Sequence, residues 1–128
     1  MITFLFFAAA LAPPVSPIAV QDTAPPAGAL AEWPIRQQAA LRCAVAVALA
    51  AEQQKAGTGS PADWPDLAAD NRGREFFVRT MAQLMDETGA TREQIADRAR
   101  AEAQDLQTGG RLIEVMPACL LMLQASGL

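Results

Sequence analysis

The two cysteines are the residues whose chemistry the sequence constrains most. Cys43 and Cys119 lie 76 positions apart and form no Cys-x-x-Cys motif, a pattern typical of a structural disulfide in an exported protein. The helical face of Cys43 carries small side chains that allow a second backbone to approach within about 6 Å, namely Ala39, Ala40, Ala46, Val47 and Ala50. We therefore predict a Cys43–Cys119 disulfide; two separate buried thiols in a cytosolic protein are the alternative.

Few other side chains could do chemistry, because the chain contains no histidine. Histidine is the usual general base near neutral pH and the commonest transition-metal ligand. Asp63, Asp66 and Asp70 would lie near one side of a short helix and could bind Ca²⁺ weakly, but the alternating acids and central glycine of a calcium loop are missing. We expect these acids to act as caps and solvated surface, and we expect no enzymatic activity, metal or cofactor.

Residues 81–98 resemble a helix-turn-helix, because a helix ending at Gly89 is followed by a short turn and a second helix. In a DNA-binding protein, the second helix would direct basic side chains at phosphates, here Arg92, Arg98 and Arg100. The same helix also carries Glu93, Asp97, Glu102 and Asp105, and the chain has a net charge of -4. We therefore favour an ordinary helical hairpin and expect no nucleic-acid partner.

The first 32 residues differ in composition from the rest of the chain. All 24 charged side chains lie at or after Asp22, and residues 2–12 form an apolar run of signal-peptide length. We predict a signal peptide over residues 1–19, a flexible Pro/Ala-rich tether over 20–32 and a helical domain over 33–128, with no transmembrane helix in the mature chain. The expected location is the periplasm or the exterior. An uncleaved anchor and a cytoplasmic location are the alternatives.

Apolar side chains in residues 33–128 recur with helical spacing, and no strand pattern is present. Glycines that can end helices, with capping residues between them, predict four principal helices at about 33–56, 71–88, 91–108 and 111–125, with a short helix near 61–69. Residues 43–51 carry no charge and should form the centre of the core. Pro117 should either kink the last helix or divide it in two. The predicted fold is an all-α, compact bundle.

One apolar stripe is a candidate ligand or partner surface. It consists of Phe76, Phe77, Met81 and Met85 on the second helix, with Trp64 as a further candidate. Methionine adapts to irregular apolar ligands, but packing in the core accounts for the stripe equally well.

Several short motifs are similar to those of a group of small exported proteobacterial proteins with two cysteines. They are Arg42-Cys43, the run 73–79 (GREFFVR), the runs 85–89 (MDETG) and 91–94 (TREQ), and the run 116–120 (MPACL). The resemblance covers about residues 33–124. No activity is established for that group, so it implies only export and pairing of the cysteines.

Two functional hypotheses follow. The first is a non-enzymatic exported protein that binds a protein or envelope partner through a partly apolar surface. The second is a carrier of an apolar small molecule or acyl chain, held between the helix of Phe77 and Met81 and the terminal segment 120–123.

Overall fold

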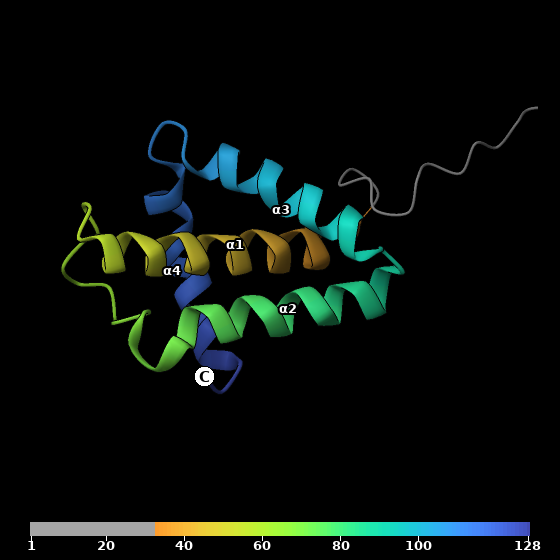
Figure 1. The fold of residues 1–128 in the computed structure, drawn as a ribbon, viewed down its shortest axis with the longest axis horizontal. Coiled ribbons are helices and arrows are strands. Elements are labelled where there is room, and N and C mark those ends of the chain that lie inside the picture. Colours follow the sequence, from red (N-terminus) through yellow and green to blue (C-terminus); the bar gives the residue numbers. More distant parts are fainter. Residues whose placement is uncertain (1–32) are drawn as a thin grey trace, which may run out of the picture.

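Four α-helices form the fold of residues 33–128, which are the residues that the computed structural model describes (Figure 1). They are α1 (Ile35–Ala56), α2 (Arg72–Thr88), α3 (Arg92–Leu106) and α4 (Arg111–Ala125), with one 3₁₀ turn, η2 (Ala69–Asn71), before α2. The predicted all-α bundle of four principal helices is confirmed. The predicted signal peptide 1–19 and tether 20–32 lie outside the described residues.

Helix α1 is the centre of the bundle. In Figure 1, α2 and α3 run along two sides of α1, and α4 crosses it steeply. Each of these three helices contacts α1 more extensively than it contacts the other two. The uncharged middle of α1 forms the centre of the core, as predicted. Within residues 43–51, Ala48 and Leu49 are half-buried, and the buried residues are Cys43, Ala44, Val45, Ala46, Val47, Ala50 and Ala51.

The helices end where the sequence supplies glycine or a capping residue. Gly57 and Gly89 follow α1 and α2 with φ of 67° and 71°, a left-handed conformation that glycine adopts without a steric penalty. Before α3, the Thr91 hydroxyl accepts a hydrogen bond from the Gln94 amide at 3.2 Å, and the Gln94 side chain accepts one from the Thr91 amide at 2.9 Å. This pair is the predicted capping box.

The short helix predicted near 61–69 is wrong. That segment consists of turns and bends, and the only regular element there is η2. Pro65 would lie inside such a helix, where it lacks an amide donor and its ring would collide with the carbonyl group of Pro61. The side chain of Gln54 instead binds the segment: its amide donates to the Pro65 carbonyl at 2.9 Å and its oxygen accepts from the Leu67 amide at 2.8 Å.

Pro117 lies inside one helix rather than between two. α4 is continuous from Arg111 to Ala125, with Pro117 on its exposed side. Since proline has no amide hydrogen, it cannot donate the helical hydrogen bond to the carbonyl group of Ile113.

Gly73 allows α2 to approach α1 closely. A Cβ atom at this position would lie 2.8 Å from the Cβ of Ala51 and 3.1 Å from the carbonyl oxygen of Leu67. The Gly73 amide also donates a hydrogen bond to that carbonyl at 2.8 Å. The start of α2 therefore fits against α1 only because residue 73 has no side chain.

Gly73→Ala is expected to lower the free energy of unfolding by about 1–2 kcal/mol, because the cost of overpacking exceeds the gain in helix propensity. Urea denaturation measures the change. Adding Ala51→Gly should recover at least half of the loss, since it removes one of the two colliding carbons. An increase in stability for Gly73→Ala alone, as at an unconstrained helical glycine, would contradict this account.

Candidate binding surfaces

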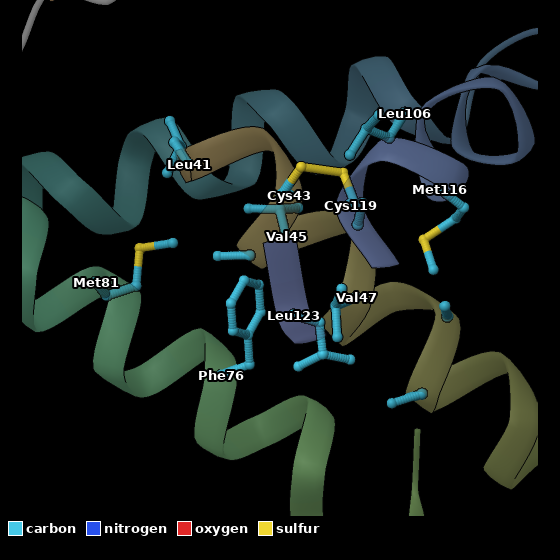
Figure 2. Close-up of a cluster of buried hydrophobic side chains, with 14 of the residues drawn as sticks. Leu41, Cys43, Val45, Val47, Phe76, Met81, Leu106, Met116, Cys119 and Leu123 are labelled. Atoms are coloured by element: carbon cyan, nitrogen blue, oxygen red, sulfur yellow. A yellow bond between two sulfur atoms is a disulfide. The ribbon is translucent and has the colours of Figure 1, made fainter. Parts of the chain in front are cut away.

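The disulfide joins the first and last helices inside the core. Cys43 of α1 and Cys119 of α4 are bonded, with Cα atoms 4.8 Å apart, which confirms the predicted pairing (Figure 2). The two residues are only 6% and 1% exposed. Because both residues are almost fully buried, the bond forms a covalent link between α1 and α4 inside the core.

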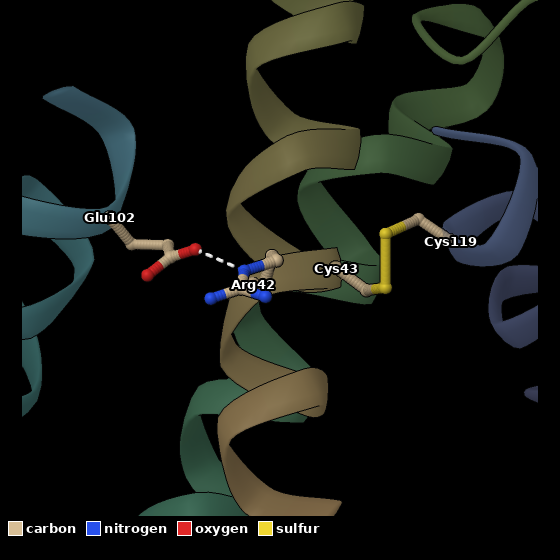
Figure 3. The surroundings of a disulfide bond; sticks show 4 residues. All are labelled: Arg42, Cys43, Glu102 and Cys119. Carbon is tan, nitrogen blue, oxygen red and sulfur yellow. Dashed lines mark hydrogen bonds and ion pairs between the residues drawn. A yellow bond between two sulfur atoms is a disulfide. The ribbon is translucent and has the colours of Figure 1, made fainter. Parts of the chain in front are cut away.

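An ion pair lies beside the disulfide and joins α1 to α3. Nε of Arg42 donates to the Glu102 carboxylate at 2.6 Å, and the Glu102 side chain is only 6% exposed. Figure 3 shows Arg42 and Cys43 leaving α1 in different directions, Arg42 toward α3 and Cys43 toward α4. Two adjacent residues of α1 therefore link it to two other helices.

The i, i+4 spacing of Arg98 and Glu102 predicted a surface ion pair, but Glu102 is buried and pairs with Arg42. The position of Glu102 nevertheless contained a signal of burial. Ile95, Ala99 and Leu106 mark the apolar stripe of α3, and Glu102 occupies a position on the same stripe. An acid on a buried stripe requires a partner, because an unpaired buried carboxylate is costly. Arg42 is that partner.

Two of the other charged candidates, Asp66 and Arg98, make contacts within the fold. The Asp66 carboxylate accepts hydrogen bonds from the amides of Ala68 and Ala69 at 3.1 and 3.0 Å, and so caps a turn as the sequence favoured. The guanidinium of Arg98 lies 4.5 Å from the ring centroid of Trp33, a cation–π contact. In residues 33–128, no group of three or more acidic or sulfur side chains is arranged to bind a metal ion.

The five candidate ligand residues lie at different depths in the fold. Phe76 and Met81 are buried in the core, at 4% and 7% exposure (Figure 2). Phe77, Met85 and Trp64 are half-buried. Phe76 lines a groove beside α4, Phe77 a hollow of about 110 Å³ against α1, and Trp64 a third hollow in the loop after α1.

A different apolar surface lies on the outside of α4. Ile113 and Leu121 are 58% and 68% exposed, and Pro117 and Ala118 between them are also exposed. These four residues and Glu114 are called the α4 outer face below. Glu114 is the acid on this face, and Arg111 at its edge pairs with Asp105 of α3 at 3.2 Å. By comparison, the exposed residues of α3 include Arg92, Glu93, Asp97, Arg100 and Asp105. The sequence analysis did not separate this face from the buried side of the same apolar helix.

No protein-family model, no curated protein and no solved structure matches this chain. Among the helices of the described region, none has the length and apolar character needed to cross a membrane.

Proposed function

We propose that this chain is a non-enzymatic, exported protein that binds a protein partner through the α4 outer face. The observation that carries the proposal is the exposure of Ile113 and Leu121 on a helix whose opposite side is bonded to the core through Cys119. Contiguous exposed apolar side chains mark interaction sites more often than isolated ones do.

The partner that fits this face is an apolar helix or segment of another protein, with a lysine or arginine placed opposite Glu114. Ile113 and Leu121 would form the apolar centre of the contact. The negative charge of Glu114 would set the orientation in which the partner binds. The disulfide would increase the affinity for the partner, because it fixes α4 before binding and little conformational freedom is then lost when the partner docks.

Location in the periplasm or outside the cell belongs to the same proposal. The Cys43–Cys119 disulfide is consistent with an oxidising compartment, and the apolar segment 2–12 has the length of a signal-peptide core.

Photo-crosslinking in the native host tests the proposed face. A benzophenone amino acid at position 121 should give an adduct with one protein, whereas the same probe at position 78 should not. Val78 is the matched control because it is an apolar residue of α2 that is 53% exposed. Leu121→Glu should then weaken binding of the purified partner by about tenfold or more, since it places a charge in an apolar contact, and Val78→Glu should leave it unchanged.

Two results would overturn the proposal. One is the absence of an adduct specific to position 121. The other is an adduct of twice the mass of the mature chain, which would identify a second copy of the chain in place of a different protein.

A further inference from the structure

A groove of about 440 Å³ opens on the surface where α1, α2 and the carboxyl end of the chain meet. Its apolar lining includes Ala40 of α1, Phe76 of α2 and Met122 of α4. The volume lies within the range of small-molecule sites, roughly 300–1,000 Å³. The carrier hypothesis placed a ligand between the helix of Phe77 and Met81 and the terminal segment 120–123. The groove lies between these two elements, but Phe76 and Met122 line it, and Phe77 and Met81 do not.

Two arginines from different helices add positive charge to this groove. Arg36 extends from α1 and Arg79 from α2, in a chain whose net charge is -4. Leu128 also lines the groove, and the guanidinium of Arg72 donates a hydrogen bond to its carboxyl-terminal oxygen at 2.5 Å, which offsets that negative charge. Nε of Arg79 donates to Glu75 at 2.8 Å, but both side chains are about half exposed, so the pair contributes little to folding stability. A guanidinium has five N–H donors, and Glu75 engages one side of it. Arg79 can therefore also bind an anion from the groove.

Glu87, an acid whose carboxylate feels the charge of Arg36, already accepts hydrogen bonds from neutral donors. Gln83 and Gln37 donate hydrogen bonds to the Glu87 carboxylate at 2.7 and 3.1 Å. These hydrogen bonds, with a smaller contribution from the charge of Arg36, hold the pKa of Glu87 below its ordinary value. Glu87 therefore does not depend on Arg36 for a hydrogen-bond partner.

We infer that the groove binds a single-chain amphiphile with a carboxylate head, such as a fatty acid. Arg36 and Arg79 would bind the carboxylate, because the planar guanidinium matches its geometry, and the acyl chain would lie along Ala40, Phe76 and Met122. This site uses a surface other than the α4 outer face and stands or falls independently of the proposed partner.

Titration of the purified, oxidised protein with decanoate, followed by ¹H–¹⁵N NMR, tests the inference. Decanol and acetate serve as probes of the chain alone and the head alone. We expect decanoate to shift the amide signals of Thr80, Gln83 and Ser126, which line the groove, and to bind about tenfold tighter than either probe.

Three variants make the test specific. Arg79→Gln should weaken decanoate binding about five- to tenfold and leave decanol binding unchanged. Arg100→Gln is the matched control, because Arg100 forms a comparable exposed pair with Asp97 on α3, and it should change neither. Ala125→Trp should fill the groove and abolish both. The inference is overturned if decanoate shifts signals elsewhere, binds no tighter than decanol, or is unaffected by Arg79→Gln in protein whose circular dichroism is unchanged.

Discussion

Replacing both Cys43 and Cys119 by alanine is expected to lower the free energy of unfolding by roughly 4 kcal/mol. The two residues are 76 positions apart, and closing a loop of that size restricts the unfolded chain by about this amount on the entropy model. For a domain of this length, the melting temperature should fall on the order of 20 °C. Thermal and urea denaturation measured by circular dichroism would give both values.

Reduction provides the control for the double variant. A reducing agent should destabilise the natural protein by a similar amount and should have no effect on the alanine variant. In freshly lysed host cells, neither sulfur should react with iodoacetamide until the protein is reduced and unfolded. Labelling of both thiols without reduction, or equal urea midpoints for the two proteins, would show that the disulfide does not hold the fold together.

Arg42→Met is expected to cost roughly 2–3 kcal/mol of folding stability, the second-largest effect. The substitution keeps most of the apolar stem of Arg42 but leaves the Glu102 carboxylate buried without its partner. Breaking a fully buried pair costs about 3–5 kcal/mol, and the 38% exposure of the Arg42 side chain reduces that figure.

The companion variant Arg42→Met/Glu102→Leu should recover most of the loss, since it replaces both charges with apolar groups of similar shape. Arg100→Met is the matched control because it breaks an ion pair whose members are 71% and 74% exposed. Its effect on the urea midpoint should be close to zero. A comparable loss for Arg42→Met and Arg100→Met would mean that burial of Glu102 contributes nothing.

Helix positions could be predicted because their signals are local. Gly57 and Gly89 end their helices through their own backbone freedom, and the Thr91 capping box needs only Gln94 three residues away. The disulfide could be predicted because only one pairing of two cysteines exists within the chain. None of these inferences required knowledge of how the helices pack.

Most of the features that were missed depend on contacts between distant residues. The wrong helix at 61–69 is the exception, because Pro65 was a local signal against it. Gln54 binds residues 65–67 through hydrogen bonds across 11 and 13 positions, and Arg42 reaches Glu102 across 60. The α4 outer face was missed for a related reason. Leu121 and Leu123 look alike in the sequence, and only the crossing of α4 over α1 decides that Leu121 is exposed and Leu123 is buried.

The covalent bond between the first and last helices also sets an order of events during biosynthesis. Cys43 cannot be oxidised correctly until Cys119 has been made, which at about 5–20 residues per second takes roughly 4–15 s. A chain interrupted before α4 would retain a single reactive thiol and uncover the apolar side of α1 that α4 normally covers. Both features distinguish the interrupted chain from the finished protein, and the uncovered apolar side would make the interrupted chain prone to aggregation.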